Sequence, residues 1–191
     1  MEAIDEAPLL MRHRVTVDAY VRMIEAGVLG HEPRVELIDG EVIDMAAIGS
    51  RHGAAVKRLV ARLTAAVGTR AVVSVHDPLR LGDWSEPEPD LMLLLPRDDF
   101  YESAHPSATD VLLLIEVADT SARYDRQIKL PLYARHGVAE VWLVDLDARL
   151  VRFFRAPQGD AYTDITATET PGPTSVGLLP RIAIDLTGLL G

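Results

Sequence analysis

Two carboxylates occupy positions where an acidic residue is unfavourable. Glu116 lies inside the apolar run Val111–Ala118, and Asp90 begins a second apolar run over 90–95. A buried carboxylate without a partner becomes protonated, pairs with a cation or binds a metal ion. If the two runs are neighbouring strands, both side chains can reach one point at the edge of a sheet. Two carboxylates, together with waters and a substrate phosphate, are a usual way to hold Mg²⁺.

Each of these acids also has a purely structural interpretation. Glu116 could form a buried salt bridge with an arginine, and Asp90 could be a turn residue at the start of a strand. The sequence pattern alone leaves both alternatives open. An arginine between the two carboxylates would favour the structural interpretation, whereas a bound divalent ion would favour chemistry.

Lys129 is the third candidate for chemistry. The chain has only two lysines against 17 arginines, so lysine is not its usual way to place a positive charge. A compact ammonium with a tunable pKa suits contact with a phosphate or polarisation of a water. Lys129 follows Glu116 by 13 residues, across a short loop, and could reach back over the strand end. The alternative is an exposed helical lysine paired with Asp125, four residues earlier.

The net charge of −10 argues against a protein that coats nucleic acid with its whole surface, because such binding depends on neutralising phosphates. The charge is uneven, however. No acid lies between Asp44 and Asp77, and this segment carries five basic residues, including Arg51, Arg58 and Arg62. These arginines are candidates for contact with nucleic-acid phosphates. A basic, solvated helix face is the alternative.

Length and composition predict one globular domain in 191 residues, of which 48% are hydrophobic and 25% are charged. We expect a loose N-terminal arm over 1–14 and a single domain over 15–191. The absence of cysteine excludes disulfides and thiol chemistry. No apolar run approaches the roughly 18 residues of a membrane span, and the acidic N-terminus does not resemble a signal peptide. A cytoplasmic protein without a membrane partner is the expectation.

The N-terminal half is predicted to alternate helices with short strands. Thr16 and Ser50 are predicted N-caps, and Asp39-Gly40 supplies the positive φ angles of a type I′ hairpin turn. The predicted elements are a helix from 17 to about 26, a hairpin over 35–43, a basic helix over 51–67, and strands over 71–75 and 79–81.

The C-terminal half is predicted to contain the centre of the sheet. The two long apolar runs are typical of strands buried on both faces. Strict alternation would place Glu116 on the same face as Leu112 and Leu114. A helix kinked or restarted at Pro131 should follow. The predicted elements are strands over 90–95 and 111–118, a helix over 124–136, strands over 138–146 and 150–155, and a loop-rich tail with one or two edge strands. Together these predict an α/β domain whose mixed central β-sheet is flanked by helices, with an N-terminal helix and a β-hairpin.

An ordered set of short motifs resembles the Uma-two family of restriction-endonuclease-like proteins, within the PD-(D/E)xK nuclease superfamily. The resemblance runs from about residue 35 to residue 154, well over half of the chain. The last stretch, Gly-Val-Ala-Glu-Val-Trp-Leu-Val-Asp over 137–145, is the most recognisable. The motifs are Val-Glu-Leu-Ile-Asp-Gly-Glu over 35–41, Ser-Arg-His over 50–52, Pro89-Asp90, Ile115-Glu116-Val117, Asp125 with Lys129 and Tyr133, and that last stretch.

The resemblance implies a role for each matching residue. Asp90 would be the acid of the Pro-Asp half-motif, and Glu116 the acid of the second half. The superfamily lysine normally stands two residues after that acid, but position 118 here is alanine. The lysine role would therefore pass to Lys129 on the next helix. Glu36 would complete the metal ligands. His52 also matches a family position; its role would be auxiliary, and the alternative is a histidine satisfied at the start of its helix.

The chemistry that the resemblance implies is metal-assisted hydrolysis of phosphodiester bonds in DNA. Asp90 and Glu116, with help from Glu36, would hold Mg²⁺ or Mn²⁺, and Lys129 would orient the attacking water. A restriction-endonuclease-like core and a homodimer are expected, since two-fold dimers are the commonest assembly. A non-catalytic nucleic-acid-binding or regulatory module that retains the nuclease fold is the alternative function.

Overall fold

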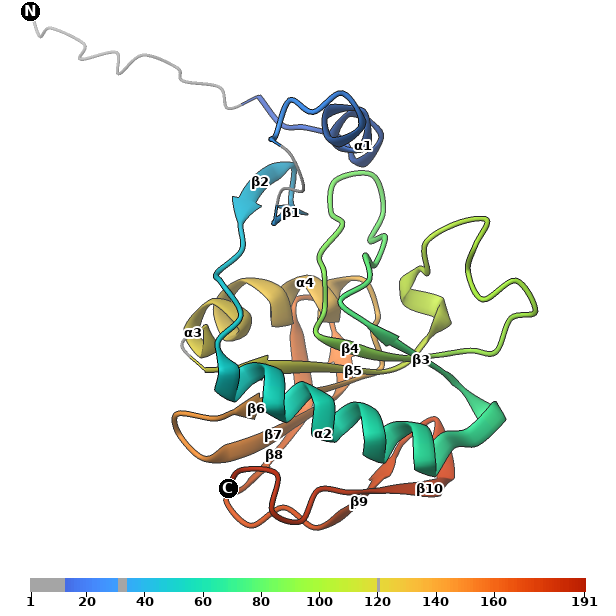
Figure 1. The fold of residues 1–191 in the computed structure, drawn as a ribbon, viewed down its shortest axis with the longest axis vertical. Coiled ribbons are helices and arrows are strands. Elements are labelled where there is room, and N and C mark those ends of the chain that lie inside the picture. The colour runs from blue at the N-terminus through green and yellow to red at the C-terminus, as the bar shows by residue number, and fades with distance from the viewer. Residues whose placement is uncertain (1–12, 31–33, 120) are drawn as a thin grey trace, which may run out of the picture.

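The computed structural model describes residues 13–30, 34–119 and 121–191 (Figure 1). Its helices are α1 (Val17–Glu25), α2 (Ser50–Val67), α3 (Ala122–Tyr124) and α4 (Leu130–Arg135). Its strands are β1 (Val35–Ile38), β2 (Glu41–Asp44), β3 (Val72–Val75), β4 (Leu91–Leu94), β5 (Val111–Ala118), β6 (Glu140–Asp145), β7 (Leu150–Gln158), β8 (Ala161–Thr168), β9 (Pro173–Val176) and β10 (Leu179–Asp185).

A six-stranded mixed sheet forms the centre of the molecule, in the order β3-β4-β5-β6-β7-β8. Only β5 and β6 run parallel, and the other neighbouring pairs are antiparallel. Every residue of β4, β5 and β6 is buried, as expected for apolar strands covered on both faces. The predicted α/β fold with a mixed central sheet is confirmed.

Two layers cover this sheet (Figure 1). On one face, the apolar stripe of α2 packs with the small β9–β10 sheet and with Trp142, whose ring meets Phe153 edge to face. On the other face, α3 and α4 pack through residues such as Leu132 and Tyr133. The helices therefore bury the apolar side chains on both faces of the sheet.

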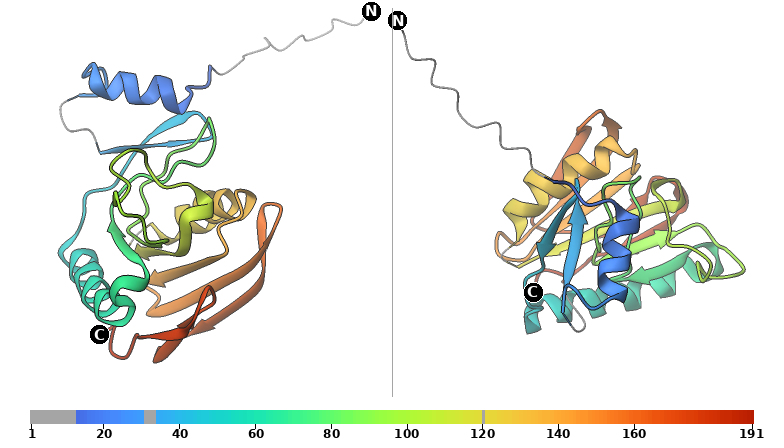
Figure 2. Two further views of the ribbon diagram at one scale, coloured as in Figure 1. Left: turned by 90° about the vertical axis from the view of Figure 1, so that its right-hand side faces the viewer. Right: turned by 90° about the horizontal axis from the view of Figure 1, so that it is seen from above.

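The N-terminal helix and hairpin lie together beyond one end of the sheet (Figure 2). Thr16 caps α1 by accepting a hydrogen bond from the backbone N–H of Ala19, as predicted. The hairpin is also confirmed, with positive φ angles of 49° at Asp39 and 82° at Gly40. Most of the predicted loose arm lies outside the described residues. Arg14, at its end, donates to the carbonyl of Asp39.

Alanine at Gly40 should weaken folding more than alanine at another left-handed glycine. A Cβ at Gly40 would lie 2.7 Å from Arg14 Cβ, whereas a Cβ at Gly27, after the end of α1, would meet nothing within 4 Å. Both positions have positive φ. We expect Gly27→Ala to lower the free energy of unfolding by roughly 1 kcal/mol and Gly40→Ala by roughly 2 to 3 kcal/mol. Urea denaturation would measure both, and equal losses would contradict the close contact.

Several predicted local features differ in the structure. Residues 79–81 form no strand, although Leu79 and Leu81 are buried, because their N–H groups bond to carbonyls of the loop over 85–87. The N-cap of α2 is Gly49, without a side-chain hydrogen bond, instead of Ser50. The tail is richer in strands than predicted, since β8, β9 and β10 all form there.

Strict alternation along β5 is also wrong near its start. The pairing of β4 with β5 shifts register: Leu93 pairs with Leu113, but the next residue, Leu94, pairs with Val111. Leu112 is the extra residue of this β-bulge, and it packs against the α2 side of the sheet. Leu114 packs on the opposite side, so the two leucines do not share a face.

Candidate metal and phosphodiester site

Asp90 and Glu116 lie side by side at the ends of adjacent strands. Leu91 pairs with Ile115 in the antiparallel β4–β5 ladder, which places Asp90 next to Glu116. The N–H of Asp90 lies 3.4 Å from Glu116 Oε2, and the N–H of Val117 donates to Asp90 Oδ2 at 2.7 Å. The structure therefore brings together the two acids that the sequence singled out.

Lys129 sits between two buried carboxylates. Its Nζ lies 3.2 Å from Glu116 Oε1 and 3.2 Å from Glu36 Oε2, and its side chain is only 6% exposed. Tyr133 donates to Glu116 Oε1 at 2.6 Å, and Tyr124 donates to Glu36 Oε1 at 3.1 Å. This arrangement differs from the predicted alternative of a solvent-exposed lysine.

Asp125 is buried beside this group but forms no ion pair with Lys129; it accepts a hydrogen bond from Ser121 instead. Among the described residues, no arginine pairs with Asp90 or Glu116. The purely structural alternative of an arginine salt bridge therefore finds no support.

A turn of π-helix positions the lysine. Residues Asp125–Lys129 form this turn between α3 and α4, and the N–H of Leu130 bonds to the carbonyl of Asp125. Pro131 has no N–H to continue the α-helical pattern, so the helix restarts there, as predicted. The wider turn buries Asp125 and Lys129 together, whereas Arg126 between them stays exposed. Such π turns often occur at functional sites.

Burial and crowding of charge perturb the titration of these groups. Burial raises the pKa of Glu116 to about 8, although Lys129 and Tyr133 favour its charged form. Burial likewise raises the pKa of Asp125 to about 6. For Lys129, burial opposes the charge, but Glu116 and Glu36 outweigh it and hold its pKa above the usual range. Lys129 is therefore the stable cation of an acidic pocket.

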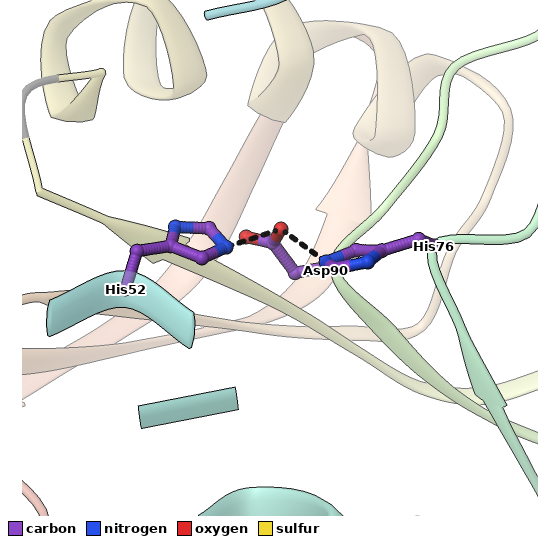
Figure 3. Close-up of side chains that lie close together, drawn as sticks. All are labelled: His52, His76 and Asp90. Carbon is purple, nitrogen blue, oxygen red and sulfur yellow. Dashed lines mark ion pairs between the residues drawn. The ribbon is translucent and has the colours of Figure 1, made fainter. Parts of the chain in front are cut away.

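Asp90 behaves differently from Glu116 because two histidines face it. His52 Nε2 lies 3.0 Å and His76 Nε2 3.2 Å from Asp90 Oδ1 (Figure 3). Burial opposes ionisation of Asp90, but the two histidines outweigh it and hold the pKa of the carboxyl well below its usual range. The neighbouring carboxylate in turn raises the pKa of His52.

Asp90, Glu116, Lys129 and His52 line one pocket of about 440 Å³, which the 45–49 segment between β2 and α2 bounds on one side. This volume is in the range of small-ligand sites. Arg34 and Lys129 are the only permanent cations among the described residues that line the pocket, whereas seven of those residues are acids. Those acids are Glu36, Asp44, Glu88, Asp90, Glu116, Asp119 and Asp125. A pocket with this charge attracts cations and would repel a phosphate in their absence.

Of the three arginines predicted to contact phosphates, two make contacts within the described part of the protein and one does not. Arg62 donates to the carbonyls of Asp185 and Thr187, which ties α2 to the C-terminal segment. Arg51 pairs with Asp119 at the rim of the pocket and also contacts the carbonyl of Leu146. Arg58 is exposed, and no contact of its guanidinium is observed within the described residues.

Sequence reasoning assigned no role to His76 or Tyr133. Tyr133 stands four residues after Lys129, and this helical spacing could have placed it on the same side. His76 offers no such signal, because only the pairing of β3 with β4 brings it next to Asp90. Its backbone adopts a left-handed φ of 54°, which the sequence does not announce.

Comparison with known proteins identifies the family of this chain. The family model described as "Uma2: Putative restriction endonuclease" matches residues 17–187. The chain belongs to the Uma2 family. The resemblance carried by the sequence motifs is thereby confirmed, and it supports a nuclease-like function. A search of curated proteins found no match.

A solved structure shares the fold of this Uma2 chain. It is described as a putative nuclease belonging to DUF820 from Anabaena variabilis. The two chains are 18% identical with a TM-score of 0.69, and the match covers 92% of this chain and 97% of the other. At this identity the likeness shows the fold alone.

Not every acid of the Uma2 motifs belongs to the pocket. Glu140, in the most recognisable stretch, is buried at the first residue of β6. It accepts hydrogen bonds from Trp142 Nε1, from Arg155 and from the N–H of Gly177. This carboxylate joins β6, β7 and the β9–β10 turn, which is a structural role.

The hydrogen bond from Tyr133 to Glu116 should contribute measurably to the stability of this Uma2 chain. We expect Tyr133→Phe to lower the free energy of unfolding by about 1.5 to 3 kcal/mol, the range for bonds to charged groups. Tyr162→Phe is a matched control, because its buried hydroxyl donates to the neutral carbonyl of Val138 and should lose only about 1 kcal/mol. Chemical denaturation at about pH 9, above the pKa of Glu116, would compare them. An equal or smaller loss for Tyr133→Phe at that pH would contradict a hydrogen bond to a charged Glu116.

Proposed function

We propose that this Uma2 protein is a divalent-metal-dependent endonuclease that hydrolyses phosphodiester bonds in DNA. One observation carries the proposal: Asp90, Glu116 and Lys129 converge in a single acidic pocket, from two adjacent strand ends and a π-helical turn. The family membership supports the same activity.

The residues of the pocket fit a divalent cation. The acids that line the pocket outnumber its permanent cations. Burial raises the pKa of Glu116 to about 8, and a divalent ion beside it would favour its charged form. Beside Asp90, the Nε2 atoms of His52 and His76 are buried without a hydrogen bond. Asp90 and Glu116 would hold the ion. When bound, a divalent ion would supply positive charge beside the scissile phosphate and acidify the attacking water.

Lys129 and Glu36 complete the proposed chemistry. The Lys129 ammonium is fixed by two carboxylates, so it can donate a hydrogen bond to a water or to a phosphate oxygen without reorganising. Glu36 lies on the far side of Lys129 from Glu116, and its Oε2 also accepts from the N–H of Glu88. Glu36 therefore acts first on the lysine, which makes it a positioning residue in this proposal.

Cleavage of supercoiled plasmid tests this function. Purified wild-type protein should nick the plasmid in the presence of Mn²⁺ or Mg²⁺, and excess EDTA should stop the reaction. Binding of DNA without cleavage under any metal would replace the proposal with a non-catalytic nucleic-acid-binding module. The described residues contain no helix that could cross a membrane. The homodimer stays a prediction.

Arg58 should contact the phosphate backbone of DNA. Because its guanidinium has no observed contact within the described parts of the chain, Arg58→Ala removes a charge without removing a structural bond. We expect weaker binding to all DNA sequences and a salt slope lower by about one. Fluorescence anisotropy at several salt concentrations would measure both. Arg22→Ala, which removes a charge from the distant helix α1, should leave the salt slope unchanged. The same salt slope in both variants would show that DNA does not bind at Arg58.

A further inference from the structure

Two histidines and one aspartate converge beside Glu116 from three different elements. His52 lies in the first turn of α2, His76 directly follows β3, and Asp90 directly precedes β4. Figure 3 shows both imidazole rings pointing at the same carboxylate. One potential ligand atom from each residue lies within 4.8 Å of the others. This group was not predicted from the sequence.

The two histidine nitrogens are buried without a hydrogen bond. His52 Nε2 and His76 Nε2 are inaccessible to solvent, and although each is close to Asp90 Oδ1, neither forms a hydrogen bond with it. Buried nitrogens without a hydrogen bond are rare and call for an explanation. Here Asp90 Oδ1 lies at ion-pair distance from both nitrogens, but without the geometry of a hydrogen bond. A metal ion that both nitrogens ligate would satisfy them as neutral imidazoles.

The backbone holds this arrangement in place. The N–H of His76 donates to the carbonyl of Asp90 at 3.2 Å, which extends the β3–β4 ladder by one step. His76 has a φ of 54°, a conformation that residues other than glycine seldom adopt and that often occurs at functional sites. Asp90 Oδ2 is occupied by the N–H of Val117, so Oδ1 is the oxygen left to face the histidines.

Two of the three distances among these atoms suit ligands around one metal ion. Two ligands bound at about 2.1 Å and at right angles, as in octahedral coordination, are about 3.0 Å apart. The two nitrogen-to-oxygen distances of 3.0 and 3.2 Å match this value. Imidazole nitrogens suit transition ions such as Fe²⁺, Ni²⁺, Cu²⁺ and Zn²⁺, whereas Mg²⁺ prefers oxygen ligands. Mn²⁺ accepts both kinds of ligand and serves as a paramagnetic probe of the site.

We propose that His52, His76 and Asp90 together bind a first-row divalent transition ion in preference to Mg²⁺. This inference rests on the proposed function, which places the metal ion beside Glu116. It adds two histidine ligands, and these determine which metal ion binds. The competing explanation is a metal-free cluster in which protonated histidines neutralise Asp90.

Binding of Mn²⁺ alone, without nucleic acid, tests this proposal. The metal-free protein is titrated with Mn²⁺ while electron paramagnetic resonance follows the free ion, and Mg²⁺ is then added as competitor. We expect Mg²⁺ to displace Mn²⁺ only at an excess of roughly 10-fold or more. His52→Gln and His76→Gln should each weaken Mn²⁺ binding at least about 10-fold, a loss seen even for the outer partners of metal ligands. His105→Gln, an exposed histidine outside the pocket, is the control.

A second readout needs no variant. Pulsed resonance spectra of Mn²⁺ bound to the wild-type protein should contain couplings to imidazole nitrogen. Bound Mn²⁺ without nitrogen coupling, or unchanged Mn²⁺ affinity in both histidine variants, would overturn the proposal. Cleavage of DNA with Mg²⁺ in those variants would then leave the endonuclease proposal standing. Mn²⁺ with nitrogen coupling, in a protein that does not cleave DNA, would support the metal site and contradict the endonuclease proposal.

Discussion

Replacing Lys129 by methionine is expected to reduce DNA cleavage by roughly 100- to 1,000-fold, the usual effect of removing one preorganised charge contact to a transition state. Methionine keeps an unbranched stem of similar length but brings no charge into the pocket. The measurement is the rate of plasmid nicking with Mn²⁺ at saturating protein. Lys57→Met is a matched control, because Lys57 is the other lysine of the chain and lies exposed on α2.

Loss of folding could imitate this result, since Lys129 pairs with two buried carboxylates. Removing one member of a buried ion pair costs about 3 to 5 kcal/mol of stability. Lys129→Arg separates the two effects. It retains the charge, and so most of the stability, but a planar guanidinium cannot replace a compact ammonium beside a water. Cleavage by Lys129→Arg at the wild-type rate would contradict a direct role for the ammonium.

Asp90→Asn should have the largest effect on cleavage, of roughly 1,000-fold or more, because it removes a negative charge that faces the proposed ion. Asparagine has the same shape and can still accept the hydrogen bond from Val117, so the strand ends should stay in place. Plasmid nicking again provides the rate, and Mn²⁺ affinity should fall with it. Asp98→Asn removes the same charge from an exposed position and should match wild type. Equal nicking by both variants would place the metal elsewhere.

The sequence carried most of the information about the two strand-end acids. Glu116 stood out because an acid in a fully apolar strand needs a partner, and Asp90 because it begins the other apolar strand. Their adjacency followed once β4 and β5 paired. Lys129 was predicted because the position where the superfamily motif normally has its lysine is an alanine here. In the structure its ammonium lies beside Glu116.

The remaining features depended on interactions that a linear pattern does not contain. His76 reaches Asp90 only through the β3–β4 ladder and a left-handed backbone conformation. The π-helical turn arises from a local change in hydrogen bonding before Pro131, where the sequence could indicate only a kink or a restart. Arg62 resembled a phosphate contact in charge, but its partners are carbonyls more than 100 residues away.

The central claim is that the strand-end carboxylates form a metal centre, and a diffraction measurement tests it most directly. Crystals of the wild-type protein soaked in Mn²⁺ would reveal the ion by its anomalous scattering. The account predicts an anomalous peak about 2.1 Å from a carboxylate oxygen of Asp90 and within bonding distance of Glu116. A peak elsewhere, or an Asp90–Glu116 pocket without any peak at millimolar Mn²⁺, would contradict it.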